Sequence, residues 1–162
     1  RHRQRRARRR GAAGPRMAAR VMSYLHSFAD ISPDTVIAVG IPAPGGWIST
    51  NSNRTRHPHA QAKGVRAWRT TAAEMAAGLE RFTGPVIIEA TIHKARNNRW
   101  DLDGITPTVK ACIDGLRDAG VLDEDDDRHV RALNLRVGCV CRPARVELRV
   151  WGIATAPTEA PR

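Results

Sequence analysis

The stretch PVIIEATIH, residues 85–93, is the clearest strand in the sequence, because it is rich in β-branched residues and opens with a proline. A basic loop over 94–99 follows it. Thr106-Pro107 then supplies a helix-capping residue with proline at the first helical position. The predicted helix runs to about residue 119 and carries an apolar stripe made of Val109, Cys112, Ile113 and Leu116.

The other predicted elements lie on both sides of this strand and helix. The β-branched run 35–41 predicts a strand, and a long loop over 42–64 leads to a helix over 65–81. Residues 130–137 and 145–151 both alternate between apolar and polar, and a turn separates them, which predicts an antiparallel hairpin. The order strand, loop, helix, strand, helix, strand, strand predicts a single α+β domain with a mixed sheet flanked by helices.

The net charge of +11 is concentrated at the N-terminus. Residues 1–20 hold nine arginines and no acid, so the remaining chain, with 18 basic and 16 acidic residues, is close to neutral. We expect a disordered arm that binds nucleic acid without sequence preference. Alternatively, translation starts at Met17 or Met22 and the residues before it are upstream sequence. The chain then divides into an arm over 1–29, a domain over 30–154 and a C-terminal tail over 155–162.

No apolar run approaches the roughly 20 residues of a membrane helix, and no secretory signal is evident. We expect a soluble, cytoplasmic protein of bacterial or phage-like type with free thiols and no membrane partner. Cys139 and Cys141 lie on one strand face, but no fourth zinc ligand is evident beside Cys112, which favours packing over metal binding. We expect His57, His59 and His129 at the surface or in contact with the residues that bind the ligand. We expect Trp47 and Trp151 in the core or at a dimer interface rather than stacked on DNA bases.

Carboxylates gather at both ends of the helix that begins near Thr106. Nine of the 16 acidic residues fall within 101–127. Asp101 and Asp103 lie two residues apart, so an extended backbone places both on one face. Hard oxygen ligands of this kind suit Mg²⁺, or Mn²⁺, and a carboxylate from the run 123–127 would complete such a site. A solvated loop and an acidic surface are the alternatives that spacing alone leaves open.

The stretch DLDGITPTVKACIDGLRDAG at 101–120, followed by DDRHV at 126–130, resembles the signature of the RusA family of Holliday junction resolvases. That family has D-L-D-N, a lysine four residues before an aspartate, an A-G turn, and D-D two residues ahead of a hydrophobic strand. The segments TNSNR at 50–54 and AWR at 67–69 resemble the family's N-terminal loop and first helix. The likeness covers about residues 35–152.

This resemblance implies a Mg²⁺ ion held by three carboxylates, together with a catalytic lysine: Asp101, Asp103 and Asp127, with Lys110. Gly104 stands where the family has asparagine, and three additional residues precede the lysine. Lys110 is matched because it keeps the spacing to Asp114; a surface pair between the two is the alternative reading of this lysine. Asp126 is the alternative third ligand, because the loop before Asp127 is longer than in the family.

We therefore expect a magnesium-dependent, structure-selective endodeoxyribonuclease with a RusA-like fold that resolves Holliday junctions. We also expect a homodimer, since a four-way DNA junction offers two symmetry-related cleavage points. The alternatives are a nuclease acting on other branched DNA and a DNA-binding protein without catalysis. A nucleotide-sugar transferase using D-x-D is disfavoured by the chain length. Candidate phosphate contacts come from basic residues in two loops and one helix: Arg54, Arg56, Arg69, Arg96 and Arg99.

Overall fold

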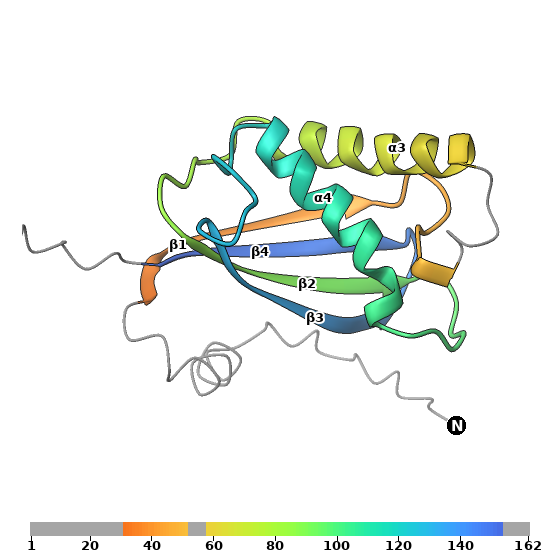
Figure 1. Ribbon diagram of the computed structural model, residues 1–162. Helices are drawn as coiled ribbons and strands as arrows, with labels where there is room; N and C mark the ends of the chain where they lie inside the picture. The colour runs from red at the N-terminus through yellow and green to blue at the C-terminus, as the bar shows by residue number, and fades with distance from the viewer. Residues whose placement is uncertain (1–30, 52–57, 154–162) are drawn as a thin grey trace, which may run out of the picture. The chain divides into compact units, whose positions relative to one another are not determined.

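The computed structural model describes residues 31–51 and 58–153, which form a four-stranded sheet with two helices on one face (Figure 1). This confirms the predicted α+β class, the mixed sheet and the order of elements. The predicted arm over 1–29 and the tail over 155–162 lie outside the described residues. The elements in chain order are β1 (Ile31–Pro42), α3 (Pro58–Ala76), β2 (Val86–Lys94), the 3₁₀ turn η1 (Asp103–Ile105), α4 (Thr106–Asp118), β3 (Val130–Val140) and β4 (Arg145–Ile153).

The predicted hairpin between the last two strands is wrong. The strand order is β1-β4-β2-β3, so β2 lies between β3 and β4. β2 pairs with β3 in parallel and with β4 antiparallel, while β4 also pairs with β1. β4 takes the central place because its alternate side chains Val146, Leu148 and Val150 are fully buried, whereas β3 is an edge strand with exposed apolar side chains. Alternation predicts which face of a strand is buried but not which strand lies beside it.

Helix α3 begins and ends earlier than the predicted range of 65–81. It starts at Pro58, and proline is tolerated in the first turn because its missing N–H has no intrahelical partner there. Gly78 adopts a left-handed backbone with φ of 79°, which ends the helix at Ala76. The predicted loop over 42–64 is shorter than expected because α3 already begins at Pro58.

The core lies between the sheet and the two helices. The predicted apolar stripe of α4 is buried there, and Trp68 of α3 is 1% exposed. Thr108 in the first turn of α4 also connects the helix to the chain after β1. Its Oγ1 accepts the Ile48 N–H at 2.9 Å and donates to the Ile48 carbonyl oxygen at 2.8 Å. The start of α4 is therefore fixed in position. Among the described residues, no helix is long and apolar enough to cross a membrane.

Gly115 lets α4 approach α3 closely. A Cβ at this position would lie 2.5 Å from the Ala72 Cβ and 2.5 Å from the Arg69 carbonyl oxygen, and a backbone oxygen cannot move aside as a side chain does. We expect Gly115→Ala to lower the free energy of unfolding by about 2–3 kcal/mol, measured by denaturant titration. Gly84→Ala is the control, because a Cβ there meets no atom within 4 Å. Equal stability of the two variants would contradict this packing.

Candidate active site

Asp101 and Asp103 lie on a well-anchored turn between β2 and α4. The preceding Trp100 packs on Trp47 with ring centroids 5.3 Å apart, and the Lys94 Nζ lies 5.2 Å from the Trp100 ring centroid. Asp103 is exposed and accepts the Gly104 N–H at 2.8 Å through Oδ1. Asp101 is also exposed, and its carboxylate makes no hydrogen bond or ion pair with the described residues. Both carboxylates are thus accessible at a fixed place in the fold.

The buried Gly104 brings this turn against the segment that follows β1. A Cβ at Gly104 would lie 3.6 Å from the Thr50 Oγ1 and 3.8 Å from the Asp101 Cβ, which is ordinary van der Waals contact. Thr50, from the polar segment TNSNR at 50–54, therefore lies beside the turn that carries the two carboxylates. Arg54 and Arg56, which belong to that segment and its continuation, lie outside the described residues.

Asp127 lies at the other end of the sheet. It precedes β3, and the Val86 N–H at the start of β2 donates to the carbonyl oxygen of His129 at 2.7 Å. Asp101 and Asp103 instead follow the end of β2, a strand of nine residues, which at 3.3 Å per residue is roughly 30 Å long. Within one chain the structure therefore does not bring Asp127 to the other two carboxylates.

The two candidates for third ligand differ in how they are engaged. The Asp126 Oδ1 accepts the N–H groups of Arg128 and His129 at 3.0 Å each and lies 2.7 Å from the His129 Nδ1. Hydrogen bonds from His129 lower the pKa of Asp126. Its carboxylate thus orders the turn that leads into β3. Asp127 is exposed and its carboxylate has no partner among the described residues, so it is the more available of the two.

Lys110 projects from α4 into a cluster of acids. Its Nζ donates to the Asp114 Oδ1 at 2.6 Å and to the carboxylate of Asp125, which also lies 3.3 Å from the Arg117 Nη1. Partial burial works to lower the pKa of Lys110, but the hydrogen bonds with the two acids outweigh it and raise the pKa. The lysine is therefore a cation at neutral pH. The pair with Asp114, which was the alternative reading of this lysine, is present, and Asp125 is a second partner that the sequence did not indicate.

The Lys110 hydrogen bond lowers the pKa of Asp125 to about 2. An unfolded aspartate titrates near pH 3.9, so this carboxylate contributes stability above about pH 4 and loses it as the pH falls towards 2. We expect this contribution to be about 1–2 kcal/mol, because exposure of Lys110 weakens the interaction. Chemical unfolding of the parent and of Asp125→Asn at pH 5 and at pH 2 measures it. The variant should lose less stability than the parent over this interval, and Asp127→Asn should behave as the parent does. Parallel losses in the parent and in Asp125→Asn would contradict the assignment.

The basic residues proposed for DNA contact divide into paired and unpaired groups. Arg69 forms a two-point ion pair with Asp118, which neutralises its charge. Arg96 and Arg99 are exposed in the loop before Asp101 and make no ion pair among the described residues.

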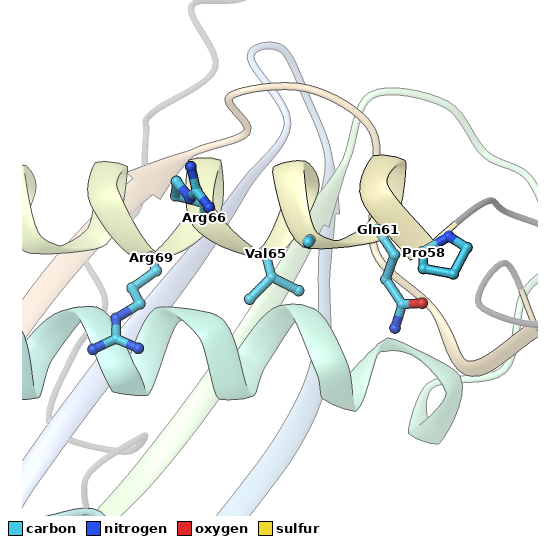
Figure 2. Close-up of a pocket in the computed structure, with 6 residues that line it drawn as sticks. Pro58, Gln61, Val65, Arg66 and Arg69 are labelled. Atoms are coloured by element: carbon cyan, nitrogen blue, oxygen red, sulfur yellow. The ribbon is translucent and has the colours of Figure 1, made fainter.

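A further exposed arginine, Arg66, lines an open hollow of about 530 Å³ on α3. Figure 2 shows Val65 and Arg69 directed from α3 towards α4, with Arg66 on the other side of α3.

A different group of side chains converges at the end of β2. The ligating atoms of His93, Cys139 and Cys141 lie within 4.8 Å of one another. Over 31–51 and 58–153, no other set of three His, Cys, Asp or Glu side chains comes this close. The sequence showed the two thiols but not the imidazole, because the parallel pairing of β2 with β3 brings them together.

Comparisons with protein-family models and with curated proteins find no match for this chain.

Proposed function

We propose that this protein is a magnesium-dependent endodeoxyribonuclease of RusA-like type that cuts branched DNA, with the four-way junction as its substrate. The observation that carries this proposal is the exposed pair Asp101 and Asp103 on an anchored turn at the start of α4. Arg96 and Arg99 lie in the loop that leads to the pair. A phosphodiester needs both features, because its charge must be neutralised while a metal ion is held against it.

The donor set fits Mg²⁺, which is usually bound by one or two carboxylates together with substrate phosphates. When bound, the ion would polarise the scissile phosphate and lower the pKa of a bound water. The chain's own residues then have separate tasks. Asp101 and Asp103 would hold the ion, Arg96 and Arg99 would bind flanking phosphates, and the N-terminal end of α4 would favour negative charge through its dipole. Lys110 would stabilise charge that develops on the phosphate or the leaving oxygen.

A homodimer is part of this proposal. The edge strand β3 exposes Leu133, Val137 and Val140 at 39%, 61% and 50%, and an exposed apolar edge strand is suited to pairing with a second copy. Two copies related by a twofold axis would present two sites to the two cleavage points of a junction. In such a dimer, Asp127 of one copy could reach the Mg²⁺ site formed by Asp101 and Asp103 of the other copy.

Cleavage of labelled DNA with Mg²⁺ and with a chelator tests the proposed function. The substrates are a four-way junction, a flap and a linear duplex of the same sequences. We expect paired cuts in the junction that require Mg²⁺, and little cutting of the duplex. Preferential cutting of the flap would favour the nuclease of other branched DNA. Junction binding without cleavage in Mg²⁺ or Mn²⁺ would favour a non-catalytic DNA-binding protein.

A further inference from the structure

An imidazole and two thiols meet at the carboxyl ends of β2 and β3, outside the proposed nuclease site. His93 is the penultimate residue of β2, Cys139 belongs to β3 and Cys141 follows it directly. The two parallel strands stay together to this point, since the Cys141 N–H donates to the Lys94 carbonyl oxygen at 2.8 Å. The three side chains are therefore held by paired backbone rather than by a free loop.

The His93 ring is held in a defined orientation. It is buried, and it lies against Gly138, where a Cβ would come within 2.6 Å of the ring. Its Nδ1 accepts the Cys139 N–H at 3.2 Å and lies 3.1 Å from the Cys139 Sγ, so an unprotonated nitrogen faces the thiols. The Nε2 is buried without a hydrogen bond and lies 3.5 Å from a Glu147 carboxylate oxygen.

Charged side chains lie close to the three possible zinc ligands. The Arg145 Nη1 lies 3.0 Å from the Cys141 Sγ. Zinc binds thiolates, so both thiols would release their protons on binding and the zinc affinity should rise with pH.

We propose that this protein binds one Zn²⁺ ion through the His93 Nδ1, the Cys139 Sγ and the Cys141 Sγ, with a fourth position open to solvent. Imidazole and thiolate are the ligands that zinc prefers, whereas Mg²⁺ requires oxygen. Ligand atoms around tetrahedral zinc are about 3.5–3.8 Å apart, so the observed group needs only small movements. On binding, the His93 Nδ1 would exchange its hydrogen bond from the Cys139 N–H for the ion. Glu147 would accept the Nε2 hydrogen, as carboxylates commonly do for a zinc-bound histidine. The fourth position is open because Cys139 is exposed.

Zinc at this place would join the edge strand β3 to the buried strand β2. This role does not depend on the proposed nuclease activity, because the ligands are neither Asp101 nor Asp103. Loss of zinc would therefore be detected as lower stability whatever the protein does to DNA.

Zinc titration of the reduced, metal-free full chain tests the proposal. We expect one tightly bound Zn²⁺ per chain, and a rise in melting temperature of roughly 5–10 °C when zinc is 100-fold above its dissociation constant. With Co²⁺ as the probe, we expect the intense visible bands of tetrahedral cobalt and a thiolate charge-transfer band in the near ultraviolet. Binding of zinc with no thiolate band would overturn the assigned ligands.

Single substitutions identify the ligands. Cys139→Ser and Cys141→Ser should each weaken zinc binding at least 100-fold, and Glu147→Gln should weaken it about 10-fold or more. Cys112→Ala is the matched control, because this thiol is buried in the core and should leave zinc affinity unchanged. Cys139 is exposed, so its serine variant should fold, and melting without zinc checks this. Equal zinc affinity in the parent and in Cys139→Ser would overturn the proposal.

A Cys139–Cys141 disulfide is the competing use of these thiols. It would lower the mass of the unreduced chain by two hydrogens and remove two of the three free thiols. A reduced chain that binds no zinc, together with such a disulfide in the chain as purified, would overturn the zinc site.

Discussion

Asp101→Asn and Asp103→Asn should each reduce Mg²⁺-dependent cleavage of a four-way junction by at least about 1000-fold, because each removes a charged ligand of the ion that polarises the phosphate. Junction affinity in the absence of metal should change less than about threefold, since Arg96 and Arg99 remain. Folding should also be preserved, because both carboxylates are exposed and only Asp103 makes a hydrogen bond, to the neighbouring Gly104 N–H. Single-turnover cleavage, with binding measured in a chelator, separates these quantities.

Asp126→Asn and Asp127→Asn belong in the same experiment, because the resemblance implies a third carboxylate that one chain does not bring to the pair. If Asp127→Asn lowers the cleavage rate as much as Asp103→Asn does, a second copy of the chain supplies Asp127 to the site. Unchanged cleavage with both variants would leave an ion held by two carboxylates and the substrate. Unchanged cleavage with Asp101→Asn or Asp103→Asn would contradict the metal site altogether.

Lys110→Ala should lower the single-turnover rate on a saturating junction by about two orders of magnitude, because it removes a positive charge that we propose stabilises the transition state. Lys110 is seven residues along the chain from Asp103, which is roughly 10 Å of helical rise. Its side chain is 56% exposed, so it is free to turn from Asp114 towards a bound phosphate. Loss of its two ion pairs should cost no more than about 1 kcal/mol each. Lys110→Arg should restore little activity, since a planar guanidinium does not replace a compact ammonium.

Arg117→Ala is the matched control for Lys110→Ala. This substitution also removes an ion pair with Asp125. However, Arg117 lies in the last turn of α4, away from the Asp101–Asp103 turn. The two variants should melt at similar temperatures, and only Lys110→Ala should slow cleavage. A rate for Lys110→Ala within about threefold of the parent would assign Lys110 to a purely structural role beside Asp114 and Asp125.

The candidate sites show where local pattern is informative and where it is not. The sequence placed Asp101 and Asp103 close together between a strand and a helix, because residues two apart along the chain stay near each other in any fold. The extended backbone expected there is wrong, since Leu102 between them has a helical backbone with φ of −66° and ψ of −41°. The sequence grouped Asp127 with the two carboxylates by resemblance, whereas β2 separates them within one chain. It favoured packing for Cys139 and Cys141 because no other ligand lay nearby in the sequence. His93 is 46 residues from Cys139 and joins it only through the parallel pairing of β2 with β3.

The fold likewise has features that local sequence determines and features that depend on tertiary packing. The sequence by itself determined the α+β class, the order of elements and the buried faces of α4 and β4, because hydrophobic periodicity and the Thr106-Pro107 start are local properties. Only the tertiary structure decided that β2 lies between β3 and β4 and that Gly115 brings the two helices together. The physical reason is that burial of one face is encoded in each segment, whereas the choice of neighbour depends on the packing of the whole core.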